Sequence, residues 1–499
     1  MSAPDTYDVV VVGGGPAGSV MAWSLARKGV RVAVVERATF PREKVCGDFI
    51  EPGGLRILEA IQCRPALADV LRLPITSTRV FIGSQVAYRG DIPYYEQKHG
   101  LPPYGYIVPR HELDTHLLDH AQAASATVYQ GCSASEIRRE GGLMRVAVRS
   151  RERNFTLSSR LVVGADGTES IVARSVGLAS TDRRYIAISQ RGYVEGVSVE
   201  RGEAAICFDD DLFPGYGWMF PMTGGRANIG VGVLSESCHR YGISVPRLFA
   251  SFVEKLRVRH PGCAGMRVVG RPVGGVVKTY GGIGRNHADG VLLVGDAGSF
   301  VDPMTGEGIT PGMESALIAA STVIEALEHG RFDAAFLSRF ERDFRHYFDP
   351  AMLYLDLCAA LLRNWHFREF WMRAGMRGFA EAGADPVFAR VAGSTFGGLE
   401  VRPPLILTLV WSRIFGDLSA GGAQMFLGFL SGRFNKPTRL IGDFGAWQRG
   451  LWRSLIEDPV WTASWLADVA KKAARVQATL WASDNPRVKG IARMIHAAK

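Results

Sequence analysis

The residues with the clearest chemical potential are the glycines of the GGGPAG segment that begins at Gly13. The apolar run Tyr7–Val12 precedes the segment and a helical pattern, Ala17–Lys28, follows it, which predicts a buried strand, a tight turn and a helix. In such a GxGxxG turn Gly13 allows the change of direction, Gly15 lets a phosphate approach the backbone, and Gly18 allows close helix packing. Free N–H groups at the helix start favour anions. We therefore expect this turn to hold a pyrophosphate.

An acidic residue follows the second predicted strand. Arg31–Val35 is a short, largely apolar run, and Glu36 lies at its end, eighteen residues beyond Gly18. A carboxylate in this place can accept hydrogen bonds from both ribose hydroxyls and would repel a 2′-phosphate. The glycine motif, the flanking strands and this acid together predict a site for a dinucleotide.

Two further motifs follow predicted buried strands later in the chain. Val163–Ser170 reads VGADGTES, whereas Val294–Gly298 reads VGDAG and is followed by GEGI at Gly306–Ile309. Asp296, at a strand end, can bind a polyol hydroxyl. A helix that opens near Gly308 would direct its N–H groups at an anion, such as the pyrimidine ring of a reduced flavin.

The three motifs, in this order, resemble the FAD-binding fold of para-hydroxybenzoate hydroxylase, flavin-dependent halogenases and geranylgeranyl reductases, over about residues 5–330. The resemblance implies FAD as cofactor, with Glu36 at the adenosine end, Asp296 on the ribityl chain and Arg110 near the cofactor. The cofactor-binding residues expected on this basis are Gly13, Gly15, Pro16, Ala17, Gly18, Glu36, Arg37, Cys46, Gly47, Arg110, Asp166, Gly167, Gly295, Asp296, Gly306, Gly308 and Ile309.

Two segments narrow the resemblance to one branch. Pro214–Pro221 (PGYGWMFP), continued by Asn228–Gly232 (NIGVG), looks like the YxWxFP…NxGxG pattern of geranylgeranyl reductases. Pro41–Asp48 (PREKVCGD) is similar to their PRxKxCG segment. The likeness implies that reduced flavin transfers a hydride to a C=C bond of an apolar, isoprenoid-like substrate. On the same basis, the catalytic residues expected in this chain are Cys46, Tyr216 and Trp218. The expected substrate pocket is formed by Tyr216, Trp218 and Phe220.

Alternatives to reduction remain open at the level of sequence. Enzymes with this fold also catalyse epoxidation and hydroxylation, so an FAD-dependent monooxygenase of an apolar natural product is the main alternative. A halogenase is less favoured, because no lysine lies between Lys44 and Lys98 and the expected WxWxIP element is replaced. A flavin-binding protein without activity is a further alternative. A purely structural role is also open for the expected site residues. Trp218 and its aromatic neighbours could be packed in the core of a sheet, and Cys46 could be a small buried apolar residue.

Motifs that the sequence lacks limit the electron donors, metals and binding partners that we expect. The chain shows no second GxGxxG in a strand-to-helix context, so electrons are expected from transient NAD(P)H or from a separate redox protein. The seven cysteines are scattered singly without metal-ligand spacing, which predicts no metal site and a reducing compartment. Nucleic acid is not an expected partner, because the chain has no dense Lys/Arg run.

The chain of 499 residues, 47% hydrophobic and 21% charged, is long enough for two or three domains. The predicted class is α/β, with a Rossmann-type FAD-binding domain that a mostly antiparallel β substrate domain interrupts, plus a helical C-terminal region. The expected bounds are 1–75, 105–184 and 281–330 for the first, 76–104 and 185–280 for the second, and 331–499 for the third.

The C-terminal third is basic and rich in tryptophan. From residue 331 onward there are 23 Lys and Arg against 15 Asp and Glu, and eight of the ten tryptophans. We expect either a peripheral contact with an anionic membrane or an aromatic helical lid. The apolar run Pro403–Trp411 is too short to span a bilayer and the N-terminus does not read as a signal peptide. The expected location is therefore the cytoplasm, with a contact at the membrane surface as an option.

Overall fold

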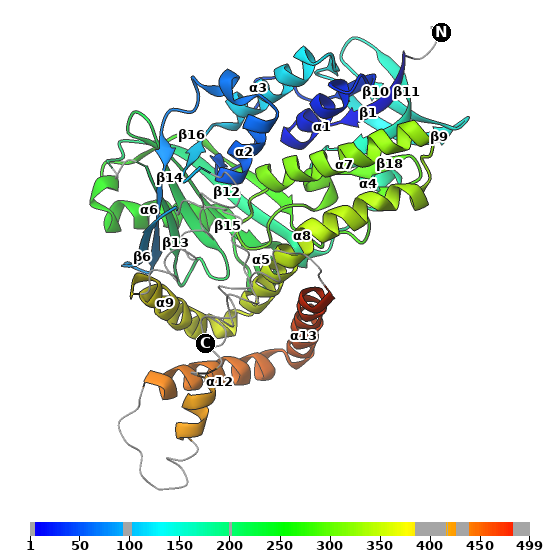
Figure 1. Cartoon of the computed structure of the whole chain (residues 1–499). Helices are drawn as coiled ribbons and strands as arrows, with labels where there is room; N and C mark the ends of the chain where they lie inside the picture. Colours follow the sequence, from blue (N-terminus) through cyan, green and yellow to red (C-terminus); the bar gives the residue numbers. More distant parts are fainter. Residues whose placement is uncertain are drawn as a thin grey trace. The chain divides into compact units, whose positions relative to one another are not determined.

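The structure is a computed structural model that describes residues 5–92, 102–198, 202–384, 416, 418–425 and 439–482. It shows a mixed α/β chain that divides into two compact units (Figure 1). The first unit comprises Met1–Pro74, Tyr95–Arg191 and Val273–Asp349, and the second comprises Ile75–Tyr94, Gly192–Pro272 and Pro350–Lys499. The α/β class with an interrupted nucleotide-binding part is confirmed, while the three-domain bounds stay a prediction.

The first unit is built on an eight-stranded sheet with the order β17-β18-β11-β1-β2-β8, extended from β11 by β10 and β9. Four neighbouring pairs in it, β2–β8, β1–β2, β1–β11 and β11–β18, are parallel. Its strands are β1 (Asp5–Val12), β2 (Val32–Val35), β8 (Thr127–Tyr129), β9 (Ser133–Glu140), β10 (Leu143–Arg149), β11 (Asn154–Gly164), β17 (His287–Ala288) and β18 (Val291–Leu293).

The central strands are apolar on both faces because helices cover the sheet. Val9, Val10 and Val11 are fully buried, as parallel strands between helical layers require. Helix α1 packs against both α3 and α7. The helices of this unit are α1 (Pro16–Ala26), α2 (Pro52–Ala60), α3 (Arg110–Ala123), α4 (Ile171–Ser175) and α7 (Ile309–His329), with a small pair of strands β3 (Phe49–Ile50) and β7 (Gly105–Ile107).

The second unit contains the strand order β15-β14-β13-β5-β6, in which β13 and β5 are parallel, whereas β15–β14, β14–β13 and β5–β6 are antiparallel. The chain passes between the units within β4 (Pro74–Ile75), β12 (Ile186–Glu195), β16 (Arg267–Lys278) and helix α8 (Ala334–Leu362). The remaining elements are β5 (Ser77–Ile82), β6 (Gln85–Asp91), β13 (Glu203–Phe208), β14 (Tyr216–Met222), β15 (Arg226–Leu234), α5 (Ser235–Tyr241), α6 (Val245–Arg259), α9 (Arg368–Ala384), α12 (Arg439–Glu457) and α13 (Pro459–Ala482).

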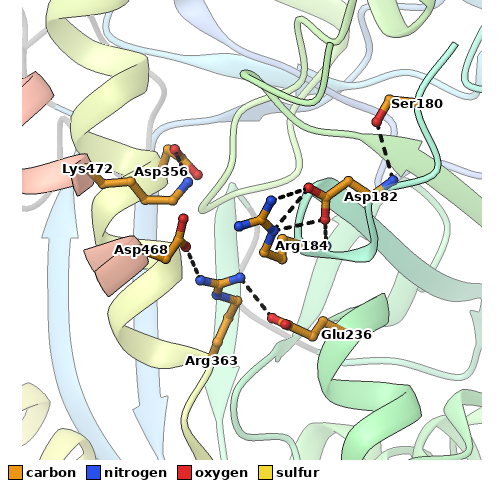
Figure 2. A network of polar contacts seen from close by, with 8 residues as sticks. All are labelled: Ser180, Asp182, Arg184, Glu236, Asp356, Arg363, Asp468 and Lys472. Carbon is orange, nitrogen blue, oxygen red and sulfur yellow. Dashed lines mark hydrogen bonds and ion pairs between the residues drawn. The ribbon is translucent and has the colours of Figure 1, made fainter. Parts of the chain in front are cut away.

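Buried ion pairs attach the C-terminal helices within the second unit (Figure 2). Arg363, only 3% exposed, donates to Glu236 of α5 at 2.8 Å and also to Asp468 of α13. Lys472 of α13 pairs with Asp356 of α8, and both are buried. These contacts make α13 part of the packed unit.

Hydrophobic packing supports the same attachment. Trp465 of α13 is 6% exposed, and its indole N–H donates to the carbonyl of Ala360 at 2.7 Å.

In the part of the chain that the structure describes, no helix is long and apolar enough to cross a membrane. The run Pro403–Trp411 lies outside the described residues.

Candidate flavin site

The glycine turn between β1 and α1 is shaped by backbone contacts at two of its three key glycines. Gly13 has φ +105°, and a Cβ there would lie 2.3 Å from the carbonyl oxygen of Ala165. A Cβ on Gly18 would lie 1.9 Å from the carbonyl oxygen of Gly13. Gly15, the N-cap of α1, is different. The nearest atom to a Cβ built on Gly15 would be Nη2 of Arg42, at 3.5 Å. The fold therefore needs glycine at Gly13 and Gly18, whereas a Cβ at Gly15 would make only an ordinary contact.

The acid after β2 is fixed by the same turn. The carboxylate of Glu36 accepts the N–H of Gly14 at 2.7 Å and the N–H of Ala38 at 2.8 Å. Glu36 is 5% exposed, and the neighbouring Arg37 is exposed. The turn thus carries an aligned carboxylate with lone pairs left for a polyol.

The second motif contacts the first through the parallel pair β1–β11. Oδ2 of Asp166 accepts the N–H groups of Ile171 and Val172 at 2.7 and 3.3 Å, and so starts helix α4. Its Oδ1 is buried and has no hydrogen-bond partner among the described residues. Burial raises the pKa of Asp166. Gly167 follows with φ +82°, a conformation that suits glycine.

The third motif meets the start of α7. Oδ1 of Asp296 lies 3.3 Å from a Cβ built on Gly308, the N-cap of the helix, and Ile309 is its first residue. Gly306 has φ +69°. A Cβ on Gly295 would lie 2.9 Å from Cβ of Ala17, so the first and third motifs are packed together. One carboxylate and the free N–H groups of a 21-residue helix therefore meet at one place.

The segment Pro41–Asp48 is attached to this site by its charged and polar side chains. Nη2 of Arg42 lies 2.9 Å from Asp114, and Nζ of Lys44 lies 3.6 Å from Asp296. The guanidinium of Arg110 hydrogen-bonds the thiol of Cys46, which Gly47 follows. The expected residues Cys46, Arg110 and Asp296 thus belong to one connected set with the glycine turn.

The thiol of Cys46 keeps its proton at neutral pH. Burial raises the pKa of Cys46, although Arg110 acts in the opposite direction. A thiol in this state can supply a proton, whereas a thiolate would act as a nucleophile.

A group of buried carboxyl groups surrounds the start of α7. Burial raises the pKa of Glu307 to about 8, although Glu307 accepts the N–H of Thr310 at 2.7 Å. Burial, with Glu307 and two further acids nearby, raises the pKa of Glu51 well above its usual range. Burial also raises the pKa of Asp302. Glu307 therefore holds its proton near neutral pH, and none of these three acids was predicted from the sequence.

Tyr216, Trp218 and Phe220 lie on strand β14 of the second unit. Trp218 is 6% exposed, its indole N–H donates to Asn228 at 2.9 Å, and its ring lies 6.3 Å from that of Phe220. In the β14–β15 pair Trp218 is opposite Gly230, where a Cβ would come within 2.1 Å of the indole. The WxFP and NxGxG segments are therefore one packing unit, and a substrate role for the three aromatic residues stays a prediction.

Besides the acids near α7, three further residues of the site were missed at the sequence level. Arg42 and Lys44 stand in the PRxKxCG segment, whose resemblance was noted without assigning them a role. Asp114 lies four residues after Arg110, and this spacing places both on one helix face. Helical periodicity therefore carried the signal for Asp114.

The residues present fit FAD. Nη1 of Arg42 is buried without a hydrogen-bond partner among the described residues, and Nη2 lies 3.5 Å from a Cβ built on Gly15. A buried guanidinium with a free donor favours an anion such as a pyrophosphate. Glu36 and Asp296 are placed for hydroxyl groups on either side. No group of His, Cys, Asp and Glu among the described residues could hold a metal ion.

Comparisons with known proteins identify an FAD-binding domain in this chain. Residues 6–198 match the family described as FAD binding domain. Menaquinone reductase of Mycobacterium tuberculosis is 34% identical over 340 residues, which cover 64% of this chain and 77% of that protein. Digeranylgeranylglycerophospholipid reductase 2 of Methanothermobacter thermautotrophicus is 33% identical over 349 residues, which cover 68% and 83%.

Solved structures give the same result. A geranylgeranyl bacteriochlorophyll reductase-like protein of Thermoplasma acidophilum matches with a TM-score of 0.65 and 25% identity, over 72% of this chain and 88% of that one. A flavin-dependent halogenase matches with a TM-score of 0.61 and 22% identity, over 73% and 67%, and shows a shared fold alone.

Fold and site define an FAD-dependent oxidoreductase. The chain belongs to the FAD-dependent geranylgeranyl reductase family. FAD-dependent reduction of C=C bonds is the activity that this membership supports.

Proposed function

We propose that the protein reduces C=C bonds of an apolar, isoprenoid-like substrate with a hydride from reduced FAD. The observation that carries the proposal is the likeness, at 33–34% identity, to reductases named for menaquinone and for digeranylgeranylglycerophospholipid. The hydrogen bond between Arg110 and the protonated thiol of Cys46 supports it, because alkene reduction needs a proton as well as a hydride.

The proposed roles follow the contacts of the first unit. The turn at Gly13, Gly15 and Gly18 would hold the pyrophosphate with Arg42, Glu36 would hold the adenosine ribose, and Asp296 the ribityl chain. Bound and reduced FAD supplies the hydride. Cys46 holds a proton on Sγ, and Arg110 orients that thiol.

The proposed substrate wall is the aromatic row Tyr216, Trp218 and Phe220. The ring of Tyr216 lies 6.1 Å from that of Trp218, and the ring of Trp218 lies 6.3 Å from that of Phe220, so the three rings form a packed apolar row. Tyr216 and Phe220 are only partly buried, which leaves ring surface available to a ligand. Electrons are proposed to come from NAD(P)H or from a separate redox protein.

Product mass under controlled oxygen tests the reaction. Purified protein is incubated anaerobically with a polyprenyl substrate and dithionite or NADPH, and the product is analysed by mass spectrometry. Addition of two hydrogen atoms per reduced bond is expected.

A product that forms only with oxygen and carries one added oxygen atom would establish a monooxygenase. Bound FAD without turnover in either atmosphere would indicate a flavin-binding protein. Omission of each reductant in turn identifies the electron source.

We also propose that the protein works in the cytoplasm at the surface of an anionic membrane, where apolar substrates dissolve. Support comes from four exposed apolar residues on α12 and α13, called here the α12–α13 apolar set: Trp452, Ile456, Val460 and Leu466, with exposed fractions of 63, 77, 80 and 44%. Trp452 and Ile456 share one helix face. The surplus of Lys and Arg in the C-terminal third would add attraction.

Vesicle flotation tests this contact. Co-flotation with anionic vesicles at low salt, reduced at high salt, is expected, because charge attraction is screened. Protein that stays in the aqueous fraction at low salt would leave the aromatic residues as a packed helical region only.

A further inference from the structure

The flavin site contains a buried carboxylate that two cations share. Asp114 of α3 is fully buried, and Arg110 donates to its two oxygens at 2.7 and 2.8 Å. Nη2 of Arg42 lies 2.9 Å from the same carboxylate. One carboxylate cannot neutralise two guanidinium groups, so Arg42, Arg110 and Asp114 by themselves carry an excess positive charge that a bound anion would balance.

The two arginines face different ends of the site. Nη2 of Arg42 lies 3.5 Å from a Cβ built on Gly15, and its Nη1 is buried without a hydrogen-bond partner among the described residues. Arg110 instead hydrogen-bonds the thiol of Cys46. Asp114 is therefore the group through which the pyrophosphate turn and the thiol are joined.

We propose that Asp114 is a positioning residue that holds Arg42 for the pyrophosphate and Arg110 for Cys46, and that it couples anion binding at Gly15 to the reactivity of the Cys46 thiol. The identity of the natural anion as FAD rests on the proposed function. The coupling itself needs no substrate.

The direction of the coupling follows from the positive charge that the two arginines place around Asp114. An anion beside Arg42 offsets part of the positive charge around Asp114, so less positive charge remains to stabilise a thiolate at Cys46. The charge of Asp48 also acts on the thiol and disfavours the thiolate in both states. Anion binding is therefore expected to slow alkylation of Cys46. By reciprocity, a modified or ionised Cys46 changes the affinity for the anion.

ADP is a suitable probe because it carries the pyrophosphate but no flavin ring that could cover the thiol. Alkylation of the Cys46 peptide in apoprotein is followed by mass spectrometry from pH 6 to 10, with and without ADP. In the wild type we expect ADP to slow alkylation severalfold at pH 8. In Asp114→Asn this effect is lost, and binding of FAD weakens at least tenfold. Asp114→Glu should recover part of both effects.

The sign of the affinity change separates positioning from simple charge. Removal of a carboxylate near an anion site favours anions by charge alone, so a purely electrostatic Asp114 predicts unchanged or tighter FAD binding in Asp114→Asn. Either result overturns the proposal, as does an ADP effect that persists in this variant. Asp119→Asn is the matched control, because Asp119 is an exposed acid on the same helix and its loss should change neither measurement.

A second variant covers the case in which Asp114→Asn does not fold. The side chain of Arg42 is 18% exposed, and Arg42→Met should fold, bind FAD weakly and lose the ADP effect on Cys46. In the Arg42→Met background Asp114→Asn should add little further loss of affinity, and additive losses contradict the proposal. Wild-type protein that binds neither FAD nor ADP would instead overturn the proposed function.

Discussion

The flavin site and the C-terminal helices both bury arginine against carboxylate, but with opposite charge balance. In the flavin site a single carboxylate, that of Asp114, serves the two guanidinium groups of Arg42 and Arg110. In the C-terminal network three carboxylates, those of Glu236, Asp356 and Asp468, surround the cations Arg363 and Lys472 (Figure 2). Excess buried cation points to an anionic ligand, whereas cations already matched by carboxylates point to a structural role.

The largest expected effects come from the glycine turn. Gly15→Val should leave the protein folded but weaken FAD binding by about 100-fold or more, because the side chain fills the pyrophosphate space. Gly18→Val should instead destabilise the fold by about 3 kcal/mol or more, because its Cβ would overlap the Gly13 carbonyl. Flavin content and urea unfolding measure the two effects. Equal loss of stability in both variants would contradict the distinction.

The next effect concerns the C-terminal network. Arg363→Met leaves Glu236 and Asp468 without their shared cation, and the free energy of unfolding should fall by about 3–5 kcal/mol. FAD affinity should not change in the folded variant, because the network belongs to the second unit. Calorimetry and flavin titration test both parts. Arg368→Met, at a more exposed ion pair with Asp210, is the control and should cost less than about 1 kcal/mol.

The protonated acids near α7 predict a dependence of stability on pH. The pKa of Glu307 is about 8 in the folded protein against an ordinary value of 4.5, so the folded state binds this proton more tightly. The resulting stabilisation is complete below pH 4.5 and is lost as the pH rises toward and past 8. Relative to Glu307→Gln, the wild type should therefore lose up to about 1.4 kcal/mol per pH unit in this range.

Urea unfolding at several pH values between 5 and 9 measures this loss. Glu328→Gln, at an exposed position near the end of helix α7, should follow the wild type. A wild type whose stability rises with pH relative to Glu307→Gln would contradict the protonated state of Glu307.

The smallest effect is expected at the membrane contact. Replacement of Trp452 and Ile456 by serine should reduce vesicle binding by about two- to tenfold, because interfacial affinity scales with buried apolar area. Val258→Ser removes a side chain that is 84% exposed on α6 and should have no effect. Flotation with anionic vesicles compares the three proteins. Equal binding by all three would exclude the α12–α13 apolar set as the contact.

The nucleotide-binding part could be predicted from the sequence because its signals are local. A valine run that ends in GxGxxG, and Glu36 after the next strand, fix the elements and the approximate place of the acid. Asp114 and the acids Glu51 and Glu307 were not predicted, because their properties depend on burial and on neighbours distant in sequence. Cys46 could be placed in a motif, but its hydrogen bond to Arg110 could not.

The C-terminal third shows the opposite case. Its tryptophans were counted as one group, yet Trp465 is buried with a backbone partner and Trp452 is 63% exposed. Composition gives the number of aromatic residues but not the side of the helix on which each one lies. The expectations for Trp411 fall outside the described residues.

The contacts of the glycine turn also set when the cofactor can be loaded during synthesis. Gly13 is packed against Ala165, and Ala17 is packed against Gly295, so the turn is completed by residues made much later. A ribosome-bound chain that ends before β18 would present the glycine sequence without the strand and helix that shape it. We therefore expect nascent chains to capture FAD only after about residue 312 has left the exit tunnel, when α7 can begin to form.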